Sequence, residues 1–140
     1  MTAMMGSYNH TIDDKGRLSI PPKLLKQLGD VFYVTVTTEQ CLAVYSEARW
    51  AQILERLSEV PLSKQKMLRP LFANAAVYDD AKGRILLPQH LRTIAKLQKE
   101  VTVVGAGTRV EIWDTATWAK QNAIEIETES LEAAMEEIGL

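Results

Sequence analysis

The chain has 140 residues, 46% hydrophobic and 24% charged, with a net charge of −2, which is typical of one ordinary globular domain or two small halves sharing a core. Cys41 is the only cysteine and His10 and His90 are the only histidines, so a disulfide within the chain is excluded and we expect neither a metal site nor another cofactor. The sequence has no apolar run near the about 18 residues that span a bilayer, and its N-terminus lacks the pattern of a secretory signal, so we expect a cytoplasmic protein without a membrane partner.

The first predicted unit, residues 7–49, follows a strand–turn–strand–helix pattern. A strand over 8–12 runs into a tight turn that ends at Gly16, where glycine fits a backbone position with positive φ. A second strand follows, and Pro21 ends it and suits the first turn of a helix. The remaining elements predicted here are a strand over 17–20, a helix over 23–28, and strands over 31–37 and 41–45.

The segment 50–73 is predicted to be a helical linker rather than a flexible spacer. Apolar residues recur at helical spacing over 47–57, and again over 63–72. Ser63 is expected to cap the second helix, and Pro70 to kink it or end it early. We expect the apolar stripes of both helices to belong to the core.

The second unit, residues 74–117, repeats the first. The segment DDKGRLSIP at 13–21 recurs 67 positions later as DAKGRILLP at 80–88. Three further matches follow in the same order: 34–36 with 101–103, 42–45 with 110–113, and Trp50 with Trp118. The chain is therefore a tandem duplication, with strands expected over 76–79, 84–87, 100–104 and 109–113 and a helix over 89–97.

The last segment, 118–140, is predicted to be a helical tail, with a helix over 129–138 whose apolar stripe we also expect to belong to the core. Residues 121–140 carry six glutamates and no lysine or arginine, whereas residues 1–120 hold 16 basic and 12 acidic side chains. The negative net charge thus hides a modestly basic body. The tail is either a solvated helix or an electrostatic element that acts against DNA or a neighbouring subunit.

The two turns hold the candidate site. In each turn an aspartate precedes an arginine by four positions, and residues so spaced can face each other across a tight turn. The aspartates can pair with the arginines or cap the turn amides. The residues assigned to the structure of the turns are Asp13, Gly16, Asp80 and Gly83.

The basic residues of the turns, Lys15, Arg17, Lys82 and Arg84, are the candidates for DNA binding. Arginine on a two-stranded ribbon can enter the major groove and bond to O6 and N7 of guanine, while lysine suits phosphate. Spacing alone leaves DNA binding and a merely solvated turn equally open. Further basic residues stand close by in each repeat: Lys23, Lys26, His90, Arg92 and Lys96.

The doubled motif resembles the MraZ family. The segments 13–21 and 80–88 are similar to its paired Asp-x-x-x-Arg motifs, and 111–114 with Trp118 is similar to its second repeat. The resemblance covers residues 5–122, and one motif alone would indicate only a SpoVT/AbrB-like hairpin. Residues 1–6 look longer than is usual in that family.

The resemblance implies an α+β protein with a double-split β-α-β fold, built from two pseudo-twofold-related SpoVT/AbrB-like halves, with additional helices in the linker and at the C-terminus. It also implies a sequence-specific, nucleoid-associated transcriptional regulator. Such a protein binds double-stranded DNA at short G-rich direct repeats upstream of its own operon, the division and cell-wall gene cluster. A cyclic homo-oligomer is implied as well.

Two other classes of function compete with this interpretation. The acidic pairs Asp13–Asp14 and Asp79–Asp80 could hold Mg²⁺ for phosphoryl chemistry, but each adjoins a lysine and an arginine and no nucleophile–base pair accompanies them, so we expect no enzyme. An AbrB-like assembly or antitoxin-type module without sequence-specific regulation is the other alternative. It would not need a basic cluster around both turns.

Overall fold

The computed structural model describes residues 3–140 of the chain. The strands are β1 (Ser7–Thr11), β2 (Arg17–Ser19), β3 (Val31–Val36), β4 (Cys41–Ser46), β5 (Ala76–Asp79), β6 (Arg84–Leu86), β7 (Glu100–Gly105) and β8 (Val110–Asp114). The helices are α1 (Pro22–Leu28), α2 (Glu47–Ser58), α3 (Leu62–Met67), α4 (Arg69–Ala73), α5 (Gln89–Ile94), α6 (Thr115–Ile126) and α7 (Glu129–Glu137). This mixed content confirms the predicted α+β class.

Strands of the two repeats interleave in one antiparallel sheet. The strand order is β1-β7-β8-β4-β3-β5, and β2 and β6 form a separate two-stranded ribbon. Exchanging each strand of the first repeat for its counterpart in the second returns the same order read in reverse, as a twofold axis requires. The predicted pseudo-twofold relation between the halves is therefore confirmed, and neither half forms a sheet of its own.

The pairing register locates the pseudo-twofold axis. In the ribbon, Leu18 lies opposite Ile85, which is its own counterpart 67 positions later. In the six-stranded sheet, Ala43 lies opposite Glu111, again its counterpart in the second repeat. Equivalent residues that face each other must lie on the axis, so the axis runs through the centre of the ribbon and the centre of the sheet.

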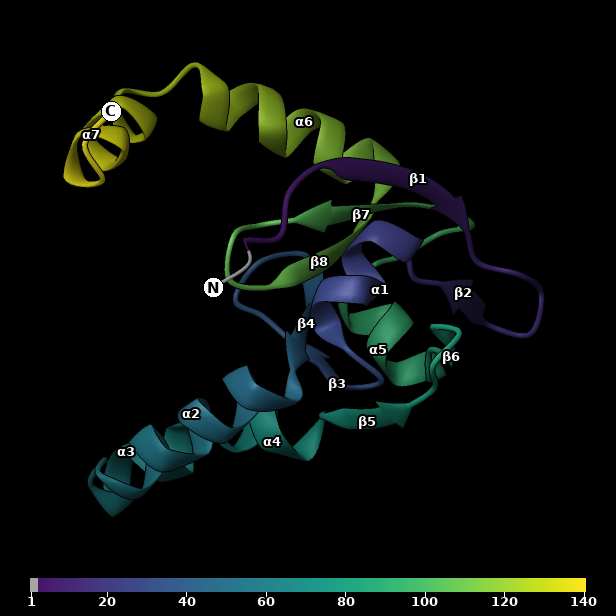
Figure 1. Cartoon of the computed structure of the whole chain (residues 1–140), viewed down its shortest axis with the longest axis horizontal. Coiled ribbons are helices and arrows are strands. Elements are labelled where there is room, and N and C mark those ends of the chain that lie inside the picture. Colours follow the sequence, from purple (N-terminus) through teal and green to yellow (C-terminus); the bar gives the residue numbers. More distant parts are fainter. Residues whose placement is uncertain (1–2) are drawn as a thin grey trace.

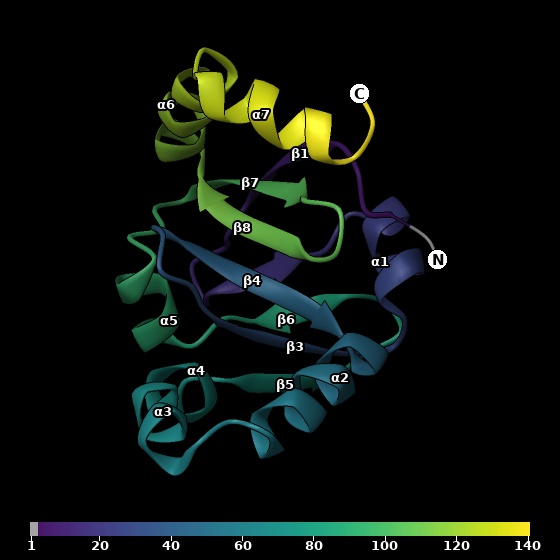
Figure 2. The same cartoon turned by 90° about the vertical axis from the view of Figure 1, so that its left-hand side faces the viewer.

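The core lies between the six-stranded sheet and a layer formed by α1, α5 and the ribbon (Figure 1, Figure 2). Leu18 and Ile85 face into it from the ribbon, and Phe32 and Ile112 face into it from the sheet. Because both repeats supply this one cluster, neither can bury its apolar surface alone.

The hairpin expected between the first two strands of each repeat is not a pair of hydrogen-bonded strands. The Asp13 N–H donates to the Arg17 carbonyl at 3.0 Å, so the tight turn forms. Beyond the turn the strands diverge: β1 pairs with β7 and β2 pairs with β6. Each first strand pairs with the third strand of the other repeat, β1 with β7 and β5 with β3, and the two second strands meet on the axis.

The linker helices differ in detail from the prediction. The helix expected over 63–72 splits into α3 and α4 at Leu68, two residues before Pro70. Pro61, not Ser63, occupies the N-cap position of α3. The expectation that both apolar stripes are core is wrong for Leu54 and Met67, which are 44% and 78% exposed. In the second repeat, α5 ends at Ile94 rather than at residue 97.

Two helical arms project from the same side of the body (Figure 1). We call α2–α4, residues 47–73, the linker arm, and α6–α7, residues 115–137, the C-terminal arm. Both begin directly after the last strand of a repeat, and Trp50 in α2 corresponds to Trp118 in α6. Among residues 3–140, no helix is long and apolar enough to cross a membrane.

Candidate nucleic-acid interface

The β2–β6 ribbon presents one buried and one exposed face. Leu18 and Ile85 point inward, since side chains alternate along a strand. The ladder extends past the strands at both ends, because the Leu87 N–H donates to the Gly16 carbonyl and the Ile20 N–H to the Gly83 carbonyl, each at 2.9 Å. The side chains on the exposed outer face are those of Arg17, Ser19, Arg84 and Leu86.

The ribbon brings Arg17 and Arg84 together on this outer face. Arg17 lies opposite Leu86 and Arg84 lies opposite Ser19, so the arginines are diagonal neighbours across the axis. Diagonal neighbours in an antiparallel pair lie about 7–8 Å apart, within reach of long side chains. Both arginines also line one shallow surface hollow of about 380 Å³. Lys15 and Lys82 are exposed in the turns that flank the ribbon.

In the first turn, Asp13 organises both the backbone and Arg17. One carboxylate oxygen, Oδ1, accepts from the N–H groups of Lys15 and Arg17 at 2.9 and 2.8 Å. The other, Oδ2, accepts from Nε of Arg17 at 2.7 Å. The amide and guanidinium of Arg17 and the amide of Lys15 lower the pKa of Asp13. Asp13 thus both caps the turn and forms an ion pair with Arg17.

In the second turn, Asp80 caps the backbone only. Its Oδ1 accepts from the Lys82 N–H at 2.8 Å, as in the first turn. Within the described residues 3–140, however, Arg84 has no ion pair with Asp80 or another carboxylate. The turn backbone is therefore conserved between the repeats, while the Asp–Arg pair is present only in the first.

The two turn glycines pack against helices. Gly16 has φ 87° and Gly83 has φ 69°, so both adopt the left-handed region as predicted. A Cβ on Gly16 would lie 3.0 Å from the Arg92 guanidinium of α5, and one on Gly83 would lie 2.8 Å from Leu25 of α1. Arg92 donates from Nε to the Leu87 carbonyl at 3.0 Å, so its side chain is held against the protein rather than projecting outward with the other basic residues of the second repeat.

Comparisons with known proteins agree with this architecture. The family model described as "MraZ protein, putative antitoxin-like" matches residues 3–69 and again 71–139. The chain belongs to the MraZ family. A "Transcriptional regulator MraZ" from Caldicellulosiruptor saccharolyticus is 40% identical over 98% of this chain and 99% of its own length. Another, from Carboxydothermus hydrogenoformans, is 46% identical over 81% of this chain and 82% of its own length.

The MraZ match makes this chain a member of a family of transcriptional regulators rather than of enzymes. The two model matches meet at residue 70 in the linker arm, so each contains one Asp-x-x-x-Arg turn. The tandem duplication inferred from the sequence is thereby confirmed.

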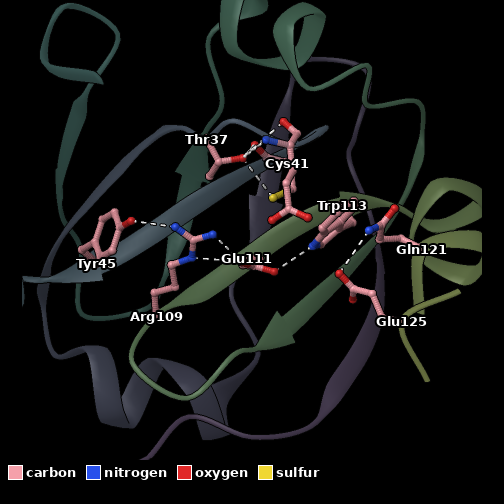
Figure 3. Close-up of polar contacts among 9 residues, drawn as sticks. Thr37, Cys41, Tyr45, Arg109, Glu111, Trp113, Gln121 and Glu125 are labelled. Atoms are coloured by element: carbon pink, nitrogen blue, oxygen red, sulfur yellow. Dashed lines mark hydrogen bonds and ion pairs between the residues drawn. The ribbon is translucent and has the colours of Figure 1, made fainter. Parts of the chain in front are cut away.

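Sequence reasoning missed a polar network on the outer face of the six-stranded sheet (Figure 3). Arg109 donates to Oε2 of Glu111 from Nε and Nη2 at 2.9 and 2.7 Å, and from Nη1 to the Tyr45 hydroxyl at 2.9 Å. Trp113 donates to Oε1 of Glu111 at 3.0 Å. Burial opposes the charge of Arg109, but the bonds to Tyr45 and Glu111 outweigh it and raise the pKa of Arg109. The strand pattern VEIW gave no signal that Glu111 lies on the axis with two partners.

One part of this network could be mistaken for a metal site. Ligand atoms of Glu39, Cys41 and Glu111 lie within 4.8 Å of one another. Both Glu111 oxygens already accept hydrogen bonds from Arg109 and Trp113. Burial raises the pKa of the Cys41 thiol to about 12, so it stays protonated at neutral pH, whereas metals bind the thiolate. The donor set fits a structural polar cluster better than a cation site.

Proposed function

We propose that this MraZ-family regulator binds double-stranded DNA through the outer face of the β2–β6 ribbon, with Arg17 and Arg84 as its base-reading residues. The observation that carries the proposal is that the duplicated motif places both arginines, exposed, on one side of a two-stranded ribbon. A ribbon of this kind fits the major groove, where arginine bonds to guanine. Lys15 and Lys82, at the flanking turns, suit the phosphates.

The size of the ribbon limits what one subunit can read. Each strand has three residues, which at roughly 3.3 Å per residue covers only about three base pairs. A modestly basic body adds little non-specific affinity. Several subunits that bind several short DNA repeats, or boxes, at the same time would raise the overall affinity, because linked sites increase the effective concentration. This supports a cyclic homo-oligomer on G-rich direct repeats.

The outer face is asymmetric, which favours direct repeats over palindromic sites. Around the pseudo-twofold axis, Ser19 of the first repeat corresponds to Leu86 of the second. Leu86 is 57% exposed beside Arg17, and an apolar side chain in the groove suits the methyl group of thymine. On the strength of the resemblance, we also propose that the target lies upstream of the regulator's own operon, in the division and cell-wall gene cluster, and that the protein associates with the nucleoid.

An assembly module without sequence-specific regulation is the second candidate. Both helical arms expose apolar side chains that favour self-association, among them Met67 and Ile126, which are 78% and 61% exposed. Self-association of the arms, however, gives no reason for an exposed pair of arginines on the ribbon.

The test is fluorescence anisotropy with duplexes from the region upstream of the protein's own gene. We expect binding to rise steeply from one box to four and to collapse when the spacing shifts by half a helical turn, because boxes on one face lie about 10 bp apart. Lys15→Ala should weaken all sequences alike and flatten the salt dependence by about one unit. Equal affinity for the upstream duplex and a shuffled one would reject sequence-specific binding.

A further inference from the structure

The C-terminal arm carries an unpartnered apolar and acidic groove. Leu131 and Met135 on α7 and Ile138, its C-cap residue, recur at helical spacing and are 42%, 39% and 77% exposed. Between α6 and α7 lies a hollow of about 420 Å³. Its apolar lining residues include Ile126, Leu131 and Met135, and its acidic ones are Glu127, Glu129, Glu132 and Glu136.

The linker arm carries a surface of opposite charge. Leu62 and Met67, at the two ends of α3, are 66% and 78% exposed. Lys64 and Lys66 lie between them, and Arg69 follows in α4. Residues 60–75 contain these three basic side chains and no acidic one. A short helix that exposes two large apolar side chains and two lysines is the counterpart of an apolar groove lined by glutamates.

The two surfaces cannot meet within one chain. In Figure 1 and in Figure 2, taken at right angles, α3 and α7 lie at opposite ends of the same side of the body. Exposed apolar patches of this kind mark contact surfaces. A second copy of the chain can bring the complementary surface to each of them.

We propose that α3 of one subunit docks into the α6–α7 groove of the next, with Leu62 and Met67 in the hollow and Lys64 and Lys66 against its glutamates. This deepens the proposed function, since it rests on the proposed assembly and names the surfaces that form it. The contact is heterologous because it joins two different surfaces. Each subunit keeps one free surface of each kind, so the contact propagates into a ring if the rotation closes. The ribbon takes no part in it.

Charge reversal tests the complementarity. We expect the full-length wild-type chain to sediment as an oligomer, and Lys64→Glu/Lys66→Glu and Glu132→Lys/Glu136→Lys each to sediment as a smaller species. A mixture of the two variants should regain the oligomer, because every acidic surface again finds a basic one. Ile94→Gln, at an apolar position on α5 that is 47% exposed and outside both arms, is the control and should sediment as wild type.

A second pair of variants tests the direction of the contact. Leu62→Gln/Met67→Gln removes the docking helix and leaves the groove, while Leu131→Gln/Met135→Gln does the reverse. Each alone should be monomeric, and their mixture should stop at heterodimers, which have one intact contact. All four side chains are exposed, so circular dichroism should show the wild-type fold for both variants.

The outcomes separate the contact from the proposed function. If Leu62→Gln/Met67→Gln forms dimers alone, the groove packs against another groove and the heterologous contact is wrong. If the wild type assembles and all arm variants assemble equally well, the contact lies elsewhere while the proposed assembly stands. A monomeric wild type would overturn both, and DNA binding by the ribbon would still be judged by its own assay.

Discussion

The two Asp-x-x-x-Arg turns share a backbone but differ at the surface. In both, the aspartate caps the amide two residues later, at 2.9 and 2.8 Å. Only in the first does the aspartate also hold its arginine, Arg17, by a bond of 2.7 Å. The two repeats thus share the aspartate cap that the turn backbone requires, while the exposed charged groups that a partner could contact differ between them. A pseudo-symmetric scaffold can in this way read an asymmetric sequence.

The largest expected difference between the turns concerns DNA affinity. Arg17→Ala and Arg84→Ala should each cost about 1–3 kcal/mol at the specific site. We expect the loss to be larger for Arg17, because Asp13 already orients its guanidinium and less side-chain entropy is lost on binding. The measurement is anisotropy with the upstream duplex, with Lys120→Ala on α6 as the control.

A larger loss for Arg84→Ala would show that Asp13 competes with DNA for Arg17 rather than preparing it. Wild-type affinity in both variants would place the DNA contact away from the ribbon.

The turn glycines should differ in their effect on stability. Alanine at a left-handed position costs about 1–2 kcal/mol. Gly83→Ala should cost more than Gly16→Ala, because its Cβ would lie 2.8 Å from Leu25, which packs against the core, whereas at Gly16 the nearest groups are the Arg92 guanidinium at 3.0 Å and the Leu87 carbonyl at 3.2 Å. Urea unfolding of both variants measures this, and the reverse order would contradict the packing described for α1 and α5.

Leu86 should have a smaller, sequence-dependent effect. If it contacts a thymine methyl group, replacing that thymine by uracil should cost wild-type protein about 0.8 kcal/mol, the value of one buried methylene. Leu86→Ser should bind the two duplexes equally. Anisotropy with single thymine-to-uracil changes across one box is the measurement, and a position-independent response of wild type would remove Leu86 from base reading.

The smallest effect is the pH dependence of the first turn. Because the pKa of Asp13 is lowered from 3.8, its interactions stabilise the folded state above that pH and are lost as the pH falls through the folded-state pKa. Asp13→Asn should therefore be slightly less stable than wild type at neutral pH, and the difference should vanish in acid. An NMR titration that gives Asp13 a pKa at or above 3.8 would contradict the ion pair.

Local signals in the sequence were enough to predict the turns and the duplication. Gly16 and Pro21 mark the turn and the end of the strand whatever surrounds them, and the recurrence at 80–88 is visible without a structure. Strand pairing was harder, because adjacent strands normally form hairpins. The pairing of β1 with β7 depends on contacts between the repeats, which no local pattern encodes.

The exposed arms show a second limit of structure prediction from the sequence. The apolar stripe that contains Met67 has the same helical spacing whether it faces a core or another subunit. Among the site residues, the outward direction of the Arg17 and Arg84 side chains can be predicted from the alternation of side chains along a strand. That the two arginines lie near each other across the axis cannot be predicted in this way, since it requires β2 to pair with β6.

Site-specific cross-linking to DNA tests the central claim most directly. Ser19→Cys places a thiol on the outer face of the ribbon, opposite Arg84, where a photo-cross-linker can be attached. The native Cys41 is buried with a pKa raised to about 12, so it should not react with the label. We predict cross-links from Ser19→Cys to bases within a box, and none from Ala123→Cys on α6. Cross-links from α6 alone, or equal yields from both sites, would contradict DNA recognition by the ribbon.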